Sequence, residues 1–332
     1  MKEVAALAGV SIQTVSAIIN DKPGISPETT LRVKDAIQQL GYRPYSVARS
    51  LRTGQTHTIA FIVTDINNPS FSTIASAAED IAHGFGYNLV LFNTHDDPER
   101  EASYVRTVSD RWIDGVIFVA TGDRSISLES LLLAKIPTVV IDRIPMGYSG
   151  ASVTLDNYKA GFMAAEHLIG LGHKRIAHIS GPRQLHLARE RLTGFRDCIN
   201  KANIPWADLN SSEGNWSCAS GYEAMKQILN IAEVPTAIFA GNDRMAIGAI
   251  QAITDIGWNV PEDISVMGLD DIETAAFHSP ALTTIRQSFP EMASRCVNLL
   301  MEILDGKEPS QLQIVIEPSL IERKSTSQPK KV

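Results

Sequence analysis

The sequence predicts an α/β protein in which a small helical head precedes a larger body of doubly wound parallel sheets. From residue 58 onward, strand-like apolar runs alternate with helix-length amphipathic segments, a pattern typical of parallel sheets covered by helices. Before residue 58, three short helical segments follow one another without a strand-like run. The body has too many strand–helix units for one small sheet, so we expect two similar lobes joined near residues 142–156.

The expected strands of the body are short, and amphipathic helices separate most of them. The strands cover Thr58–Val63, Asn88–Asn93, Gly115–Ala120, Thr138–Asp142, Arg175–Ser180, Thr236–Ala240 and Ile264–Leu269. The helices cover Phe71–Gly84, Glu99–Trp112, Tyr158–Leu171, Leu187–Ala202, Gly221–Leu229 and Arg244–Ile256. Because ligands of such sheets bind beyond the carboxyl ends of the strands, we expect a binding site there.

The first two helices of the head have the spacing of a helix-turn-helix. A short helix over residues 2–8 stops at Gly9, which permits a backbone turn with positive φ. Ser11 is placed to cap a second helix over residues 12–20. In a helix-turn-helix the second helix enters the major groove of DNA. A small three-helix bundle without DNA contacts is the alternative.

A third helix begins at Ser26-Pro27, where serine caps and proline occupies the first helical position. Val33, Ile37 and Leu40 form its expected apolar stripe. Gly41 ends this helix.

The segment over residues 45–57 is expected to be either an interdomain linker or a hinge. Val47 and Leu51 lie four residues apart, on one face of a possible short helix. Such a segment, too short to be a stable helix alone, could become helical on DNA and insert an apolar wedge into the minor groove.

The charge of the chain divides unevenly between head and body. The 332 residues have a formal net charge of −7, which argues against nucleic-acid binding by the surface as a whole. Residues 1–57, however, carry seven Lys and Arg against four Asp and Glu, a charge of +3, which leaves −10 for the remainder. A basic head on an acidic body is typical of a nucleic-acid module joined to another domain.

Several classes of protein are disfavoured by the sequence. No apolar run approaches a membrane span, and the first residues lack a signal-peptide core. Three widely spaced cysteines suggest a reducing cytoplasm. We find no nucleotide-binding, hydrolase or metal-site motif, so we expect no cofactor, no metal and no enzymatic activity. His173 and His178 are interpreted as structural.

The expected strand ends are polar and acidic. They comprise Thr64-Asp65, Asn93, Thr121, Asp142, Gly181, Asn242-Asp243 and Asp270-Asp271. Two lobes with such rims can close on a small molecule. Carboxylates and amides accept hydrogen bonds from a polyhydroxylated ligand, and a cationic ligand is also possible. A phosphate-rich ligand is disfavoured, because these strand ends lack Lys and Arg.

From end to end the chain resembles the LacI/GalR family of bacterial transcription regulators. The stretches that carry the resemblance in the head and hinge are Val4-Ala5 through Gly9-Val10-Ser11, Thr14-Val15-Ser16, Leu40-Gly41-Tyr42-Arg43-Pro44 and Val47-Ala48-Arg49-Ser50-Leu51. Those in the body are Asp156-Asn157, Leu171-Gly172-His173-Lys174-Arg175-Ile176-Ala177, Gly268-Leu269-Asp270-Asp271 and Leu282-Thr283-Thr284-Ile285. Against this family, Met1 falls within the first helix, so we expect either an upstream start or a frayed first turn.

The resemblance implies a homodimer that binds a pseudo-palindromic operator in double-stranded DNA and is controlled by a small effector. It implies a DNA-binding domain at residues 1–44, a hinge at 45–57 and an effector-binding and dimerisation body at 58–332. The body is similar to periplasmic sugar-binding proteins, whose chain crosses between two lobes three times. Lobe one then covers about 58–154 plus 286–316, and lobe two about 155–285 plus 317–332.

The resemblance also implies which residues of the head touch DNA. The DNA-contacting positions fall on Ser11, Ile12, Gln13, Thr14, Ser16, Ala17, Asn20, Tyr42, Arg49 and Leu51. Gln13 can pair in two ways with adenine, and Ile12 offers apolar contact to a thymine methyl. Most members have Arg where this chain has Ala17, so the preferred half-site should differ there. Thr14 and Ser16 match phosphate contacts, although capping and solvated surface are the alternative. Leu51 matches the minor-groove wedge.

In the body, the effector positions implied by the resemblance fall on Asp65, Ser70, Phe71, Asp142, Arg191, Trp216, Asn242 and Asp270. The Arg191 fork can hold two vicinal hydroxyls or a carboxylate, and Trp216 and Phe71 can stack on a sugar ring. Trp216 is shared with sugar-binding members, which favours a saccharide over a purine. The alternatives are core filling for Phe71, a structural salt bridge for Arg191 and interlobe packing for Trp216.

We therefore expect an allosteric DNA-binding regulator, acting as a repressor in the cytoplasm, with a sugar or sugar derivative as effector. One alternative is a soluble sugar-binding protein that no longer binds operator DNA, which the missing Arg at Ala17 alone supports. The other is a glycoside hydrolase using Asp270 and Asp271. Adjacent strand-end residues usually point to opposite sides, which disfavours that enzyme.

Overall fold

The computed structural model describes the chain except for residues 20–21, 43–54, 111–112, 207–209 and 331–332. The chain forms two compact units, Met1–Thr56 and His57–Val332. Most of the expected hinge, together with the predicted DNA contacts Asn20, Arg49 and Leu51, lies outside the described residues.

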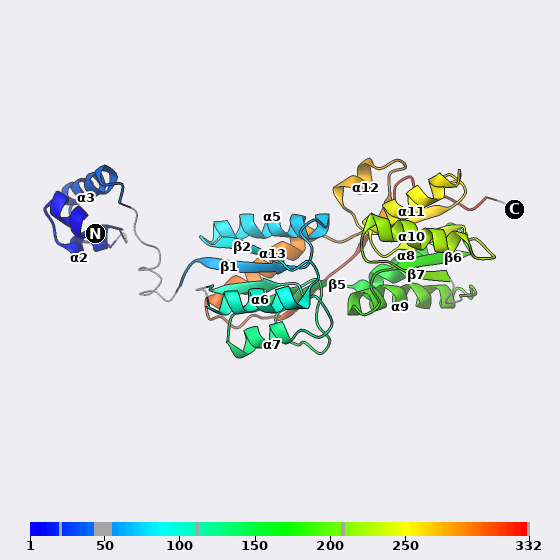
Figure 1. Ribbon diagram of the computed structural model, residues 1–332, viewed down its shortest axis with the longest axis horizontal. Coiled ribbons are helices and arrows are strands. Elements are labelled where there is room, and N and C mark those ends of the chain that lie inside the picture. The colour runs from blue at the N-terminus through cyan, green and yellow to red at the C-terminus, as the bar shows by residue number, and fades with distance from the viewer. Residues whose placement is uncertain (20–21, 43–54, 111–112, 207–209, 331–332) are drawn as a thin grey trace. The chain divides into compact units, whose positions relative to one another are not determined.

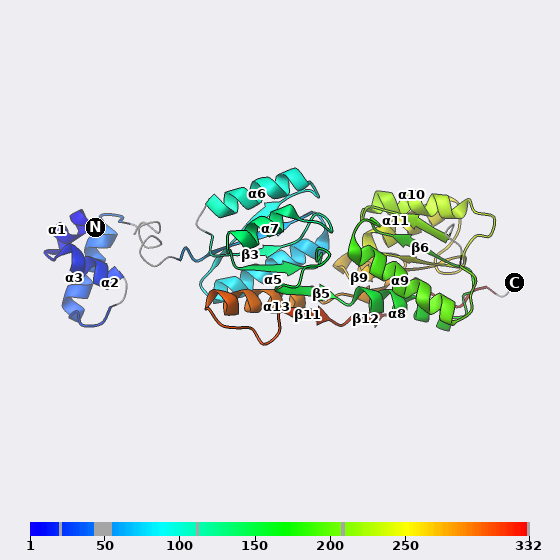
Figure 2. The ribbon, with the colours of Figure 1, turned by 90° about the horizontal axis from the view of Figure 1, so that it is seen from below.

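The first unit is a bundle of three helices (Figures 1 and 2): α1 (Lys2–Ala8), α2 (Ile12–Ile19) and α3 (Pro27–Gln39). Its buried core consists of Val4, Ala5, Ala8, Val15, Ile18, Val33 and Ala36. The expectation that Leu40 completes the apolar stripe of the third helix is wrong, because Leu40 is 43% exposed at the helix end. Ala36, one turn earlier, is buried instead.

The caps of this bundle are those that the sequence predicts. Gly9 ends α1 with φ 64°. The Ser11 hydroxyl accepts a hydrogen bond from the Thr14 amide at 3.1 Å. Ser26 does the same for the Thr29 amide at 3.3 Å, immediately before the proline that opens α3. These contacts satisfy amides that the helices cannot pair internally.

The helices α1 and α2 are bent by 100° at the turn between them, as in a helix-turn-helix. Among the described residues, no single helix is long and apolar enough to cross a membrane, although this bent pair passes the same length and composition criterion jointly.

The second unit contains two six-stranded sheets (Figures 1 and 2). The first, sheet A, has the order β11-β5-β4-β3-β1-β2, with all neighbouring strands parallel. Its strands are β1 (Thr58–Val63), β2 (Asn88–Asn93), β3 (Gly115–Phe118), β4 (Thr138–Ile141), β5 (Ser152–Leu155) and β11 (Gln313–Ile316). The helices α5 (Pro69–Gly84) and α13 (Phe289–Leu304) pack on one face, and α6 (Pro98–Asp110) and α7 (Ile126–Leu133) on the other.

Sheet B has the order β12-β10-β9-β8-β6-β7, and only β12 among these strands runs antiparallel to its neighbour. Its strands are β6 (Ile176–Ser180), β7 (Ser211–Glu213), β8 (Ala237–Ala240), β9 (Ser265–Asp270), β10 (Thr283–Arg286) and β12 (Ser319–Ile321). The helices α8 (Asn157–Gly170) and α9 (His186–Lys201) cover one face, and α10 (Cys218–Leu229) and α11 (Asp243–Asp255) the other. The short helix α12 (Glu273–Phe277) follows β9.

The chain passes between the two sheets three times: after β5, after β10 and after β11. The segments of each sheet are therefore interleaved in sequence, and both sheets share one compact unit. This arrangement places loops from distant parts of the chain next to one another at the carboxyl ends of the strands.

Two histidines of sheet B have structural contacts. His173 bonds through one ring nitrogen to the Thr236 hydroxyl and through the other to the Ser327 carbonyl, both at 2.9 Å. His178 lies in the core, where its Nδ1 is 2.8 Å from the Phe239 carbonyl and its ring stacks 4.9 Å from the Phe239 ring. Burial lowers the pKa of His178 to about 4, so it is neutral and donates to that carbonyl at neutral pH.

We predict that His178 makes the stability of the body depend on pH. Its folded pKa lies below the unfolded value of 6.5, so its stabilising effect is complete above pH 6.5 and is lost as the pH falls toward 4. Urea unfolding of wild type and His178→Phe will check this. As the pH falls from 6.5 toward 4, the wild type should lose unfolding free energy relative to His178→Phe. A difference between the two proteins that does not change with pH would contradict the prediction.

Candidate functional site

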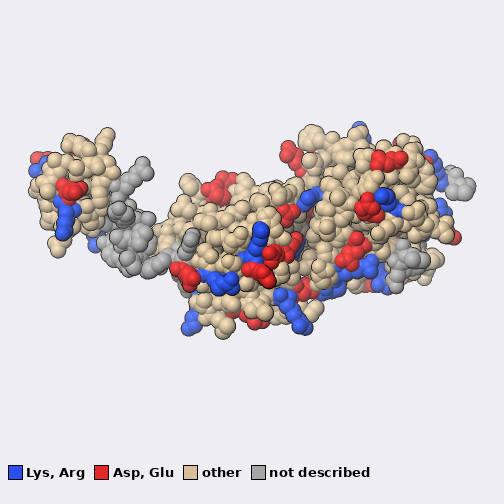
Figure 3. All heavy atoms as spheres, viewed as in Figure 1, with Lys and Arg blue, Asp and Glu red and all other residues tan. Residues whose placement is uncertain are grey.

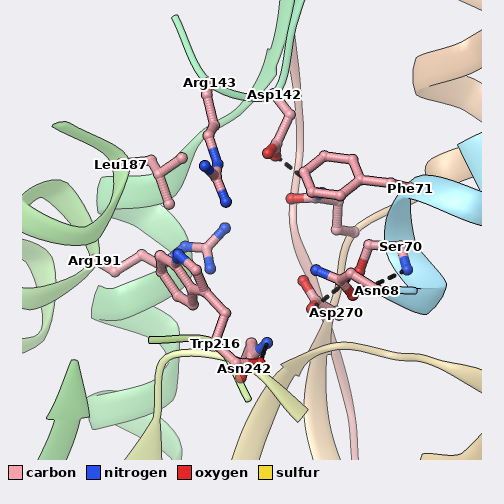
Figure 4. Close-up of a pocket in the computed structure, with 11 residues that line it drawn as sticks. Asn68, Ser70, Phe71, Asp142, Arg143, Leu187, Arg191, Trp216, Asn242 and Asp270 are labelled. Atoms are coloured by element: carbon pink, nitrogen blue, oxygen red, sulfur yellow. Dashed lines mark hydrogen bonds between the residues drawn. The ribbon is translucent and has the colours of Figure 1, made fainter. Parts of the chain in front are cut away.

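A cavity lies where the carboxyl ends of the two sheets face each other, with about 30 Å³ free for solvent (Figure 4). It is lined by Asn68, Ser70, Phe71, Asp142, Arg143, Leu187, Arg191, Trp216, Asn242, Asp270 and Gln287. These residues come from the start of α5, the ends of β4, β9 and β10, the first turns of α9 and the loops before α10 and α11. The cavity is therefore built from both sheets.

Seven of the eight effector positions that the sequence predicts line this cavity, and Asp65 does not. The Asp65 carboxylate instead lies 3.4 Å from Nη1 of Arg244, at the start of α11. This ion pair joins the loop after β1 to the other sheet.

Four lining residues were not predicted: Asn68, Arg143, Leu187 and Gln287. Helical spacing could have found Leu187, because it precedes Arg191 by one turn on α9. Asn68 caps α5 by accepting from the Ser70 amide at 3.3 Å, so its capping signal was also visible. Arg143 and Gln287 follow strands directly and had no separate signal.

Arg191 is buried, at 4% exposed, and is hydrogen-bonded on its own side of the cavity. Its Nε donates to the Asn157 amide oxygen at 2.8 Å, and its Nη1 donates to the Gly241 carbonyl at 2.7 Å. Helix α9 lies so close to α8 that a Cβ at Gly161 would overlap the Arg191 backbone. Two hydrogen bonds thus hold the guanidinium and the close packing of α8 holds its backbone, while no ion pair of Arg191 is found among the described residues.

Arg143 brings a second buried guanidinium from the end of β4 and is 7% exposed. It forms an ion pair with Asp96, and its Cζ lies 5.8 Å from the centre of the Phe71 ring. The Arg191 Cζ lies 5.5 Å from the Trp216 ring. Figure 4 shows that both arginines project into the same space. Each aromatic ring thus faces a cation as well as the cavity.

Two aspartates accompany the arginines. Asp270 is 5% exposed and accepts a hydrogen bond from the Ser70 hydroxyl at 3.2 Å. Burial raises the pKa of Asp270 well above its ordinary range, although the charge of Arg191 opposes the shift. Asp142 accepts from the Gln287 side-chain amide at 3.4 Å. The cavity therefore offers both strong acceptors and strong donors.

Two buried polar atoms of lining residues have no hydrogen-bond partner among the described residues: Trp216 Nε1 and Gln287 Oε1. The first can only donate and the second can only accept. Buried polar atoms are normally paired, and a hydroxyl group can accept from one and donate to the other.

The backbone at the cavity is strained at three residues. The φ angles are 66° at Asp142, 70° at Trp216 and 128° at Asp270. Residues other than glycine rarely adopt such positive values. Such residues gather at ligand-binding sites, where the surrounding structure holds them in place. Across the described residues, no three His, Cys, Asp or Glu side chains come together to hold a metal ion.

The predicted DNA-contacting residues of the head lie on or near the surface of α2. Ser11, Ile12 and Gln13 are exposed, and Thr14, Ser16 and Ala17 are half-buried. Tyr42 packs against the small core of the head. On the face of the body drawn in Figure 3, acidic and basic side chains are interspersed. The described part of that face therefore offers no broad basic surface for phosphates.

Comparison with known proteins adds to this geometry. Residues 1–45 match the model for bacterial regulatory proteins of the lacI family, and residues 165–326 match a periplasmic binding protein-like domain. The chain is 36% identical to the HTH-type transcriptional repressor PurR of Mannheimia succiniciproducens, covering 98% of both chains. It is also 36% identical to the ribose operon repressor of Escherichia coli, over 98% of this chain and 99% of that protein.

The crystal structure of the lac repressor dimer bound to operator and the anti-inducer ONPF superposes with a TM-score of 0.88. That chain is 30% identical, and 98% of each chain is covered. The protein described here belongs to the lacI family of bacterial regulatory proteins. It is a DNA-binding transcriptional regulator and not an enzyme, so the hydrolase alternative is excluded by its relatives.

We predict that Gly181→Ala displaces Trp216 from the cavity, because a Cβ at Gly181 would overlap the indole ring. Trp216 is 8% exposed, so displacement should shift its fluorescence to longer wavelength. The measurement uses a background in which Trp216 is the single tryptophan, with Trp112, Trp206 and Trp258 replaced by phenylalanine.

Gly170→Ala is the matched control, since a Cβ there meets no atom within 4 Å. Its emission should equal that of the parent. An unchanged emission for Gly181→Ala would show that the indole does not occupy this place.

Proposed function

We propose that this chain is a transcriptional repressor whose affinity for a pseudo-palindromic operator is controlled by a monosaccharide bound between the two sheets. One observation carries the proposal: side chains from seven distant segments gather on one small cavity that combines two arginines with two aspartates. The helix-turn-helix head supplies the DNA-binding part of the same chain.

A sugar suits the cavity better than a purine does. Each hydroxyl can donate to Asp142 or Asp270 and accept from Arg143 or Arg191, whereas a purine offers few donors. The rings of Trp216 and Phe71 can pack against apolar faces of the sugar. The cavity leaves about 30 Å³ free, room for roughly one or two water molecules, so a sugar ring enters only when the lobes part further than they do here.

On the DNA side, we propose that Ile12, Gln13 and Ala17 read bases, with Ser11, Thr14, Ser16 and Asn20 on the phosphates. Tyr42 and Arg49 support the backbone contacts, and Leu51 acts as the minor-groove wedge. The domains proposed are a DNA-binding head at 1–44, a hinge at 45–57 and the body at 58–332. The lobes proposed are 58–154 plus 286–316, and 155–285 plus 317–332.

The proposed mechanism couples lobe closure to DNA binding in a cytoplasmic homodimer. Sugar binding changes how the two lobes of each subunit close, which alters the spacing of the two hinges in the dimer. The hinges then gain or lose the ability to form helices on the operator. The sites are allosteric in the strict sense, because each ligand changes the affinity for the other.

The test is a gel-shift series with the DNA immediately upstream of the chain's own gene, with and without D-ribose, D-glucose, cellobiose or hypoxanthine. The proposal expects a salt-sensitive, sequence-dependent shift that a monosaccharide alters. A response to cellobiose alone would point to two rings, the second in an adjoining cavity of about 270 Å³ that shares Asp142 and Leu187. A response to hypoxanthine alone would overturn the proposal that the effector is a sugar. Sugar binding without any shift would favour the sugar-binding protein that lacks operator affinity.

We predict that Gln13→Ala weakens operator binding by about 1–3 kcal/mol, because a bidentate contact to adenine is lost. Fluorescence anisotropy with operator and with unrelated DNA measures both affinities. Gln39→Ala, at the exposed end of α3, is the control and should change neither. Equal losses on both DNAs would show that Gln13 contributes no base recognition.

A further inference from the structure

Helix α9 begins without a side-chain cap of its own. Leu185 occupies its N-cap position, and the apolar side chain of leucine cannot accept a hydrogen bond. The other long helices on sheet B are capped locally, α8 by Asp156, α10 by Ser217 and α11 by Asn242. Yet α9 is the helix that carries Leu187 and Arg191 into the cavity.

The missing cap is supplied from the other sheet. Asp123 lies between β3 and α7 of sheet A. Its Oδ1 accepts a hydrogen bond from the His186 amide, the first of α9, at 2.7 Å. Its Oδ2 lies 2.5 Å from Nη2 of Arg189, one turn further along the same helix. A carboxylate at this end of a helix is also favoured by the helix dipole.

The same residue also holds the opposite wall of the cavity. The Asp123 carbonyl accepts a hydrogen bond from the Met146 amide at 2.9 Å. Met146 belongs to the loop that follows β4, and this loop begins with Asp142 and Arg143. One residue on sheet A is therefore bonded both to the loop that carries Arg143 and to the helix that carries Arg191.

Other contacts join the two sheets, but among the described residues none of them completes a helix. Arg244 lies 3.4 Å from Asp65, and the Ser70 hydroxyl lies 3.2 Å from Asp270. Helix α11, which begins beside Arg244, already has its cap from Asn242. The Asp123 contact differs because separation of the lobes would leave the first amide of α9 unpaired.

We propose that Asp123 is a positioning residue that caps α9 only when the lobes are closed, and thereby makes the placement of Arg191 and Leu187 depend on closure. The inference rests on the proposed effector function of the cavity and adds how that cavity senses closure. When the lobes part, α9 loses its cap and the Arg189 ion pair together. When they close, both form and the first turns of α9 become ordered against the ligand.

Hydrogen exchange of the full chain, measured by mass spectrometry without any sugar, tests the capping step itself. Asp123→Ala should speed exchange at the start of α9 by about tenfold, because the His186 amide loses its acceptor. Asp123→Asn keeps an oxygen that can accept from the amide, so it should retain part of the protection. Asp80→Ala, an exposed residue of α5, is the matched control and should leave α9 unchanged.

A double-mutant cycle tests the link to the cavity, with D-ribose, D-glucose and cellobiose as probes in calorimetric titrations. Asp123→Ala and Arg189→Ala should each weaken binding of the responsive sugar by about five- to tenfold, the size expected for a lost cap. The two residues share their ion pair, while Asp123 also caps His186 and Arg189 also donates to the Arg183 and Gln184 carbonyls. The loss in the double variant should therefore be smaller than the sum of the two single losses. Arg196→Ala, on the exposed side of α9, is the control for Arg189.

The two measurements separate this inference from the proposed function. If none of the probes binds, the proposed monosaccharide effector fails, and the exchange data alone decide whether Asp123 caps α9. Unchanged exchange at the start of α9 in Asp123→Ala overturns the inference, as do additive losses of affinity in the double variant. Should Asp123→Ala fail to fold, Asp123→Asn carries the same comparison, with lost Arg189 coupling expected.

Discussion

Two arginines, Arg143 and Arg191, and two carboxyl groups, Asp142 and Asp270, line one small cavity, and all of these except Asp142 are buried. Burying a charge is costly unless it is paired and hydrogen-bonded. Arg191 has its partners, Asn157 and the Gly241 carbonyl, on its own sheet, whereas the Ser70 hydroxyl reaches Asp270 from the other sheet. Asp270 therefore loses this donor when the sheets part, whereas the two arginines keep their partners, so the Ser70–Asp270 contact ties the state of the cavity to closure.

That constraint also explains where control can enter. The cavity is lined from both sheets, and the chain passes between the sheets three times, so a movement of one sheet against the other would act on all three connections. The ion pairs of Asp65 and Asp123 lie at the cavity's margins and join the same two bodies. In the proposed mechanism, a ligand that bridges residues of both sheets binds the closed arrangement more tightly. Such a ligand shifts the equilibrium between the open and closed arrangements by the difference in its affinity for them. A regulator then converts this shift into a change of affinity for DNA.

The sequence predicts most of the fold because its strong signals are local. The seven expected strands and six helices are present within a few residues of their expected ends. The expected elements did not include β5, β7, β10, β11 and β12, or the helices α7, α12 and α13. At the site, the family resemblance and the strand-end argument together placed seven lining residues, but Arg143 was missed. Neighbouring residues on a strand point in opposite directions, and the positive φ of Asp142 that turns Arg143 inward is visible only in the structure. Asp65 was expected in the cavity but pairs with Arg244 outside it, and a partner on a distant helix leaves no local sequence signal. The Asp123 cap of α9 left no local trace either.

The most direct test of the central claim is the reciprocity of the two sites. The affinity of the responsive sugar is measured by titration calorimetry for the free full-length protein and for the protein saturated with operator DNA. Operator affinity is then measured with and without saturating sugar. Coupling through one closing body requires that both ratios be the same and differ from one. A sugar affinity that operator DNA leaves unchanged, in a protein that binds both, would contradict it.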